Sequence, residues 1–493
     1  MKLFAAALSY RDIHTEFGLP EKFPPDVTEE AARAQDLYPD GRKDCTEVPF
    51  VTIDPPGSMD LDQAVHIEPL AEADGGNAAG GGWRVRYAIA DVAAFVTPGG
   101  ALERESLRRG QTVYLPDGSV RLHPPELSEG SASLLPDQVR PAVVWDMNVR
   151  PDGEVDSFDV YRATVRSVAR FDYAGVERDR LAGQLHPAIE HLPAVGKARM
   201  SSDERRNAIN LRLPSISVEP EEATPDTAAR TYRLSIDPRE PMNDYNAEVS
   251  LMAGMCAAAM MVRAGRGLVR TLPPASPKQL AGFDTAAAAL GFHRAQESVG
   301  ELLNRVDASS PQGMALMRDA QGLLRGASYY AFGIGDSSQR GSGSAATGAA
   351  ADVPIHAGVG GHYAHVTAPL RRLVDRYATE ICLAIAAGKP EPDWVVRGYQ
   401  QVVETMGSST SLANKVDRAC LDLTEAVVLQ PWVGHNFAAA VLHAAKDTAD
   451  VFISEPPVTA PCSGRPAEGS QTDVTLVSAD AKQRSVRFAW PAD

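Results

Sequence analysis

Three carboxylates lie close together between two apolar segments, in the stretch FVTIDPPGSMDLDQAVHIE at residues 50–68. The run Phe50–Ile53 predicts a buried strand, two prolines and a glycine end it, and Ala64–Glu68 alternates like a second strand. Asp54, Asp60 and Asp62 therefore share one tight loop. Their mutual repulsion would raise their pKa values or open the loop unless a cation offsets it. Oxygen ligands of this kind select Mg²⁺ or Mn²⁺, so the loop predicts a metal site or, as the alternative, a solvated acidic turn.

The same stretch resembles the signature of the ribonuclease II (RNB) family, in which a strand ends in TIDP and aspartates follow in the pattern D-x5-D-x-D-D. Asp54, Asp60 and Asp62 match the first three positions, and Gln63 stands where the family has its fourth aspartate. Three further segments resemble family segments and keep the family's order: YAIADVAAFVTPGGALERESLRRG at 87–110, VYLPDGSVRLHPPELSEGSASLLP at 113–136 and HAGVGGHYAHVTAPLRRLVDRY at 356–377. On this joint match the chain is identified as a member of the RNB family.

The resemblance implies an Mg²⁺-dependent exoribonuclease that degrades single-stranded RNA from its 3′ end and releases nucleoside 5′-monophosphates, with Mn²⁺ as a possible substitute for Mg²⁺. It assigns Asp54 and the position of Gln63 to the principal metal. It assigns Asp60 and Asp62 to the attacking water, to further metal-bound waters or to a second cation. A bound divalent ion would lower the pKa of a coordinated water and clamp phosphate oxygens.

The resemblance also implies residues that hold the RNA. Arg371 in the TAPLRR segment matches the family's active-site arginine, which pairs with the scissile phosphate. Tyr114 matches a tyrosine that stacks on the terminal nucleotide, which gives grip without sequence choice. Arg372 and His365 complete the expected RNA-binding set, although His365 is as well explained as a buried polar group.

Two departures from the family pattern leave the level of activity open. Gln63 replaces an anionic ligand by a neutral amide, whose oxygen can still coordinate Mg²⁺ but attracts it less. Cys420 stands where the family has a glutamate, and Glu425 or Asp422 nearby could serve instead. The alternatives are therefore an RNB scaffold that binds RNA but cleaves it weakly, and a metal-dependent hydrolase of another phosphodiester.

Composition limits the partners that the chain can have. The 493 residues carry a net charge of -16, which argues against a broad basic surface that grips duplex DNA. A narrow basic channel remains compatible with that charge, because the local field steers a phosphate chain. Its candidate residues are Arg104, Arg108, Arg109, Arg371, Arg372 and Arg376.

Cysteine usage and hydropathy indicate the compartment. The five cysteines, Cys45, Cys256, Cys382, Cys420 and Cys462, form no C-x2-C pair, which indicates a reduced, cytoplasmic protein without a zinc site or disulfide framework. We expect no signal peptide, no membrane-spanning helix and no membrane partner. We also expect a monomer that binds single-stranded RNA and not DNA.

The order of helix-like and strand-like segments predicts an α+β fold in three parts. Residues 1–48 form a short segment with one helix at Thr28–Asp36, too small for the cold-shock domains that precede the catalytic domain in well-known family members. Residues 49–430 form the RNB catalytic domain, with a central β-sheet and surrounding helices. Residues 431–493 form a small all-β OB-type barrel, because short strand-like runs alternate there with turn residues.

Individual elements follow from periodicity within these parts. We expect strands at Trp83–Phe95, Arg140–Val149, Val155–Val165, Phe437–Leu442, Ala449–Ile453, Gln471–Val477 and Arg484–Ala489. We expect helices at Ala101–Gly110, Tyr245–Leu268, Lys278–Gly291, Gln296–Val306, Asp375–Ala387 and Trp394–Met406. Two stretches rich in small residues, Glu72–Gly82 and Gly333–Val353, predict loops. Asp91, at the end of an apolar strand, predicts a buried carboxylate with a structural role.

Overall fold

A five-stranded closed barrel forms the base of the molecule. This structure, a computed structural model, describes residues 5–70, 81–202, 205, 207–221, 230–236, 240–334 and 353–491. The barrel strands are β2 (Lys43–Ile53), β3 (Gln63–Pro69), β4 (Trp83–Ala90), β7 (Val139–Val149) and β8 (Val155–Phe171), in the order β2-β3-β4-β7-β8. β8 pairs in parallel with β2 and closes the barrel, while its other edge pairs antiparallel with β7. The barrel includes Lys43–Val48, which the sequence had led us to place in the N-terminal segment.

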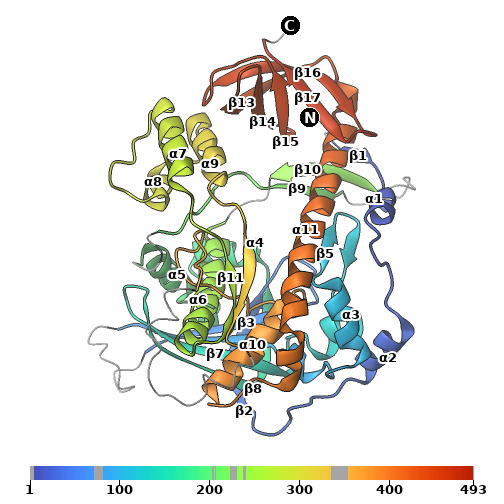
Figure 1. The fold of residues 1–493 in the computed structure, drawn as a ribbon, viewed down its shortest axis with the longest axis vertical. Coiled ribbons are helices and arrows are strands. Elements are labelled where there is room, and N and C mark those ends of the chain that lie inside the picture. Colours follow the sequence, from blue (N-terminus) through green and yellow to red (C-terminus); the bar gives the residue numbers. More distant parts are fainter. Residues whose placement is uncertain are drawn as a thin grey trace.

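Helices complete the predicted α+β fold, and only some of them pack on this barrel (Figure 1). They are α3 (Ala101–Arg109), α4 (Tyr173–Ala182), α5 (Leu192–Ser201), α6 (Pro241–Arg263), α7 (Pro277–Ala289), α8 (Val299–Arg305), α9 (Pro311–Gln321), α10 (Leu373–Ala386) and α11 (Asp393–Leu429). The largest apolar core joins the barrel residues Tyr87 and Trp145 to Met252 of α6 and Ile381 of α10. Burial of this continuous apolar surface holds the helices on the barrel.

Short elements fill the remaining connections. They are β1 (Ala5–Ala7), α1 (Arg11–Glu16), α2 (Pro25–Arg33), β5 (Val113–Leu115), β6 (Gly118–Val120), β9 (Ile216–Pro220), β10 (Thr231–Ile236), β11 (Gly267–Thr271) and β12 (Ser328–Phe332). The N-terminal segment thus has two helices in place of the one predicted. α2 begins earlier than expected because Pro25 occupies its first position, where a missing N–H is harmless.

Helix α6 needs separate comment because its length and apolar composition alone would allow it to cross a membrane. In the structure 61% of its most apolar window is buried, and it packs on α5, α10 and β11. A single such helix is weak support for a membrane span, since a core helix passes the same test. The helix also ends at Arg263, not at Leu268 as predicted, because Gly265 takes a positive φ of 67° and Gly267 begins β11.

A long helix links the part that contains the first barrel to the C-terminal barrel. α11 runs for 37 residues along the molecule, far beyond the predicted Trp394–Met406 (Figure 1). Gly398 lies inside it where a Cβ would come within 2.6 Å of the Tyr377 hydroxyl oxygen, so the glycine permits close packing on α10. Residues 408–411 are serines and a threonine, which are weak helix formers, and packing overrides their preference here.

The C-terminal part is the expected five-stranded barrel. It closes in the order β13-β14-β15-β17-β16, from β13 (Asn436–Ala444), β14 (Thr448–Ser454), β15 (Pro457–Ser463), β16 (Gln471–Asp480) and β17 (Ser485–Ala489). Strand β15 was not predicted, because Pro457 and Pro461 weaken a strand pattern. Most of the two predicted loops, residues 71–80 and 335–352, lies outside the described residues.

Candidate active site

The aspartate loop joins β2 to β3 and is fixed by backbone contacts at both ends. The Asp54 N–H donates to the Phe171 carbonyl oxygen at 3.0 Å, and the Ala90 N–H donates to the Asp62 carbonyl oxygen at 2.9 Å. Between these points Gly57 has a φ of 82°, a conformation that favours glycine in this turn. The loop therefore has one defined path out of the barrel.

Ser133 fixes the middle of the loop from the segment that follows β6. Its hydroxyl donates to the Met59 carbonyl oxygen at 2.6 Å and accepts from the Leu61 N–H at 2.9 Å. The Leu134 N–H also donates to the Leu61 carbonyl oxygen, at 3.0 Å. The segment at residues 113–136, which resembles a family segment, thus holds the loop that carries the carboxylates.

Asp62 connects the loop to the segment before α10. One carboxylate oxygen accepts a hydrogen bond from the Leu370 N–H at 2.8 Å, and the other lies 3.5 Å from Nε of Arg371. The Arg371 guanidinium remains about half exposed, whereas the Asp62 carboxylate is buried. Two segments far apart in the sequence thereby place the Arg371 guanidinium beside the Asp62 carboxylate, and the predicted pairing of Arg371 with a phosphate stays a prediction.

Burial dominates the electrostatics of the three carboxylates. Desolvation raises the pKa of Asp54 to about 6, with a further contribution from the charge of Asp60 and opposition from Arg371. Desolvation likewise raises the pKa of Asp60 and, more strongly, that of Asp62. One Asp54 oxygen, Oδ2, is buried and has no hydrogen-bond partner among the described residues.

These features fit a hard divalent cation. A buried carboxylate oxygen without a partner is unfavourable, and coordination to a cation would satisfy it. The available donors at the loop are carboxylate oxygens, which match Mg²⁺ or Mn²⁺. Asp54, Asp60 and Asp62 are the residues that could hold such an ion.

Gln63, the predicted fourth ligand, is engaged at both ends of its amide. Its Nε2 donates to the Thr367 carbonyl oxygen at 2.7 Å, and its Oε1 accepts from the Tyr87 hydroxyl. An amide oxygen has two lone pairs, so one remains for another partner. Metal coordination by Gln63 stays a prediction. The observed hydrogen bonds of Gln63 connect the end of the loop to β4 and to the segment before α10.

Tyr114 lies beside the carboxylates on the short strand β5. Val113 and Leu115 are buried while Tyr114 between them is 54% exposed, as alternation along a strand requires. The Thr112 N–H donates to the Arg371 carbonyl oxygen at 3.0 Å, so β5 is tied to the arginine segment. Desolvation raises the pKa of Tyr114, and Arg371, Asp60 and Asp62 also act on that pKa. The exposed ring is thus available next to the site.

Arg372 and His365 are held by protein partners. Arg372 forms a two-point pair with the buried Asp375, through Nε at 2.5 Å and a terminal nitrogen at 2.9 Å. His365 Nδ1 lies 2.8 Å from the Tyr329 hydroxyl, and desolvation with nearby Arg372 lowers its pKa well below the usual value. These contacts explain both residues structurally, and their RNA-binding role remains a prediction.

Several candidate channel arginines also have internal partners. Arg109 pairs with Glu105 at 2.7 Å, and buried Arg376 pairs with Glu103 at 3.1 Å. Arg108 shares Glu105, whereas Arg104 is 64% exposed and 3.9 Å from Asp26. Arg109 and Arg376 are therefore held in buried ion pairs, and their role in a basic channel stays a prediction.

Asp91 has the structural role that the sequence predicted. Its buried carboxylate accepts hydrogen bonds from Arg42 and Arg162, each at 2.9 Å. Cys420, in contrast, packs in an apolar cluster with Tyr10, Val113 and Tyr232. Asp422 pairs with Arg418 at 2.8 Å, and this partner belongs to α11 and not to the aspartate loop.

Arg170 and Tyr173 were not singled out from the sequence. The Arg170 guanidinium reaches the aspartate loop and donates to the Ser58 carbonyl oxygen at 2.9 Å. Its positive charge lowers the pKa of Asp54 and so opposes the effect of burial. The Tyr173 hydroxyl accepts from Asn246 at 3.2 Å, and Asp54 and Arg371 both act on its pKa. Neither residue stands in a recognisable sequence motif. The pairing of β8 with β2 brings the end of β8 to the aspartate loop, and the sequence alone did not show this.

Two parts of the chain match known protein families. Residues 42–386 match the RNB domain, and residues 435–490 match the RNase II-type exonuclease C-terminal S1 domain. Ribonuclease R of Vibrio cholerae is 26% identical over 442 residues, which cover 83% of this chain and 49% of that protein. The chain thus spans about half the length of the curated relatives it matches.

Solved structures show the same fold at low sequence identity. RNase R of Mycoplasma genitalium in complex with ribose methylated single-stranded RNA has a TM-score of 0.81 at 17% identity, over 97% of this chain and 77% of that one. Yeast Ssd1, a pseudonuclease, has a TM-score of 0.66 at 15% identity, over 94% of this chain and 55% of that one. The family match over residues 42–386, which carry the aspartate loop and Arg371, shows that the chain belongs to the RNB family.

Proposed function

We propose that this protein is a hydrolytic 3′-to-5′ exoribonuclease that uses Mg²⁺ to degrade single-stranded RNA and releases nucleoside 5′-monophosphates. The observation that carries the proposal is that one loop holds three buried or half-buried carboxylates and that the half-exposed Arg371 lies 3.5 Å from one of them, Asp62. Family membership supports the reaction class, and the names of the relatives agree with it.

Asp54, Asp60 and Asp62 are the proposed metal-binding residues. A divalent ion bound there would supply a water of lowered pKa and would neutralise charge on the phosphate. The raised pKa values of the three carboxyls and the buried, unpartnered Asp54 Oδ2 support this assignment. Gln63 would add its second lone pair or act only through its hydrogen bonds with Tyr87 and Thr367.

Arg371 and Tyr114 are the proposed substrate contacts. The arginine can turn from Asp62 to a phosphate, because a guanidinium binds phosphate oxygens at two points. Such a pair stabilises the charge that develops on the scissile phosphate. The exposed Tyr114 ring offers a face on which the terminal base stacks. Arg372 and His365 would support the RNA indirectly by shaping the segment that carries Arg371.

A second candidate function is an RNB scaffold that binds RNA and cleaves it weakly. Gln63 favours it, because its amide takes the place of a carboxylate and is already held by two hydrogen bonds. Yeast Ssd1, which is described as a pseudonuclease, has a similar fold.

Incubation of the purified protein with 5′-labelled linear RNA and Mg²⁺ separates the two candidates. An exonuclease would shorten the labelled RNA stepwise and would leave a circular RNA of the same sequence intact. Binding of the linear RNA without shortening would support the scaffold, and cleavage of the circular RNA would contradict an exonuclease.

A further inference from the structure

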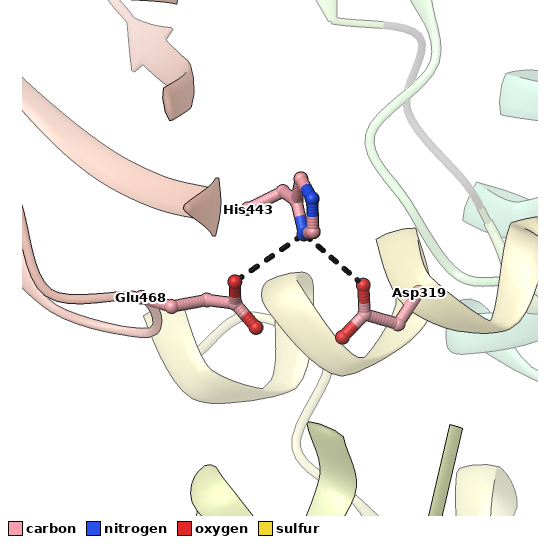
Figure 2. Close-up of side chains that lie close together, drawn as sticks. All are labelled: Asp319, His443 and Glu468. Carbon is pink, nitrogen blue, oxygen red and sulfur yellow. Dashed lines mark ion pairs between the residues drawn. The ribbon is translucent and has the colours of Figure 1, made fainter. Parts of the chain in front are cut away.

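A second group of ligating side chains lies where helix α9 meets the C-terminal barrel. Asp319 comes from α9, His443 from β13 and Glu468 from the segment between β15 and β16 (Figure 2). His443 Nδ1 lies 3.6 Å from Asp319 Oδ1 and 3.3 Å from Glu468 Oε2, and the three ligand atoms lie within 4.8 Å of one another. Nothing in the proposed RNA chemistry uses these residues.

The spacing fits a small tetrahedral ion as well as it fits simple ion pairs. Ligand atoms about 2.1 Å from a tetrahedral zinc ion lie roughly 3.4 Å from one another. The two distances from His443 Nδ1, 3.3 and 3.6 Å, lie on either side of that value. Imidazole nitrogen and carboxylate oxygen are both zinc ligands in proteins, and three protein ligands leave the fourth position to water.

Charge at the junction is not balanced by the protein alone. Two carboxylates face one imidazole, and Asp319 Oδ2 is buried without a hydrogen-bond partner among the described residues. Arg318 pairs with Asp450 at 3.1 Å, so this cation is already engaged.

The surroundings hold the three side chains in place and leave room beside them. Glu468 Oε2 accepts a hydrogen bond from the Ala444 N–H at 2.7 Å, which orients the carboxylate toward His443. A Cβ on the adjacent Gly469 would lie 2.5 Å from a Leu290 side-chain carbon, so the glycine allows the Glu468 segment to lie close to α7. A cavity of about 480 Å³ is lined by Asp319 and His443 together with Arg318, Arg325 and Asp450.

We propose that Asp319, His443 and Glu468 bind a divalent transition-metal ion, with zinc the best match, and that the ion ties the C-terminal barrel to α9. The mixed nitrogen and oxygen donors distinguish this site from the all-oxygen aspartate loop, which suits Mg²⁺. The ion would reinforce an interface that already contains Met314 of α9, Leu442 of β13 and Phe452 of β14.

Titration of the chelator-treated full-length protein with Zn²⁺ tests the proposal. We expect the wild-type protein to bind one Zn²⁺ more tightly than His443→Ala or Asp319→Asn does, by more than about tenfold, since even changes behind a ligand weaken metal binding 10- to 100-fold. His435→Ala is the matched control, because His435 lies at the start of the same barrel and its Nδ1 is 3.2 Å from the Trp432 carbonyl oxygen. This control should bind Zn²⁺ like the wild type.

The comparison between variants also separates this site from the aspartate loop. Zn²⁺ bound at the loop would be equal in wild type and His443→Ala, so only the difference between them reports the junction. Zn²⁺ should raise the melting temperature of the wild type and of His435→Ala more than that of His443→Ala. Equal binding and equal stabilisation in all these proteins would overturn the proposal and leave His443 as an ion-pair partner.

A spectroscopic measurement on the wild type covers the case in which a variant does not fold. Co²⁺ is the probe, because its visible absorption is intense in tetrahedral sites and weak in octahedral oxygen sites. The proposal predicts an intense band that saturates at one Co²⁺ per chain and disappears on addition of Zn²⁺. Weak octahedral bands alone would contradict it. The result is independent of RNA cleavage, so failure of either proposal leaves the other unaffected.

Discussion

The Leu370 N–H donates a hydrogen bond to the Asp62 carboxylate at 2.8 Å, across 308 positions of sequence. This contact fixes the loop that carries three aspartates against the segment that carries Arg371. It also explains why the two segments must both be intact for the proposed chemistry. Replacement of Asp62, the side-chain partner, is therefore the most informative change at the site.

Asp62→Asn should abolish most cleavage and leave RNA binding largely intact. An asparagine oxygen can still accept from the Leu370 N–H, but the negative charge beside Arg371 is lost. We expect turnover of labelled RNA to fall at least about 100-fold, the scale of losing one strong charge-stabilising contact in an active site. Fluorescence anisotropy with the same RNA and the melting temperature serve as controls. Near-normal turnover in the variant would remove Asp62 from the mechanism.

Tyr114→Ala should weaken the grip on the 3′ end of the RNA. Loss of one stacked base costs roughly 1–3 kcal/mol, about a 5- to 150-fold change in affinity. We expect longer final products, because short oligomers dissociate earlier. Tyr330→Ala is a suitable control, since Tyr330 is also an exposed tyrosine on a strand, β12. The same end-product length in wild type and Tyr114→Ala would rule out stacking by this ring.

If Gln63 acts only through its hydrogen bonds, Gln63→Asp should lower stability without moving the Mg²⁺ midpoint of activity. A carboxylate cannot donate to the Thr367 carbonyl oxygen, and its shorter chain draws it away from the Tyr87 hydroxyl. A buried acceptor left without its donor costs about 1–3 kcal/mol. Melting temperature and a titration of activity against Mg²⁺ report the two effects separately. A lower Mg²⁺ midpoint at unchanged stability would mean that position 63 coordinates the ion after all.

Glu425→Gln should remove part of the pH dependence of stability. Glu425 is 4% exposed near the end of α11, and burial raises its pKa to about 8 against opposition from Arg418 and with a further contribution from Asp422. A raised pKa favours the protonated folded form, so its contribution is complete below about pH 4.5 and is lost as pH rises through about 8. The unfolding free energy of the wild type should fall, relative to the variant, by about 1.4 kcal/mol per pH unit in that window. Parallel denaturant curves for the two proteins between pH 5 and pH 8 would contradict this account.

The sequence predicted much of the fold because its strongest patterns are local. The apolar run Phe50–Ile53 and the alternation at Ala64–Glu68 predicted the strands on both sides of the aspartate loop, which are β2 and β3. Helix α11 was predicted too short, because packing against α10 and the barrel holds its serine-rich middle in the helix. Strand β15 was missed because Pro457 and Pro461 weaken the strand pattern, whereas barrel closure sets its place.

The residues of the candidate site could be predicted where they stand in local motifs, but their contacts with distant segments could not. Asp54, Asp60, Asp62, Arg371 and Tyr114 stand in recognisable segments, and the structure brings them together. The clamp on Gln63 could not be read from the sequence, because Tyr87 and Thr367 come from two other segments. The cluster of Asp319, His443 and Glu468 could not be predicted either, because Asp319 lies more than a hundred residues from the other two.

Release of the 3′-terminal nucleotide tests the central claim most directly. An RNA labelled in its last nucleotide is mixed with excess protein, with and without Mg²⁺, and the labelled product is identified by mass. The account predicts that the label leaves first, as a nucleoside 5′-monophosphate, and only when a divalent ion is present. Label that stays in full-length RNA while the protein binds it would contradict the account and identify the chain as a non-cleaving scaffold.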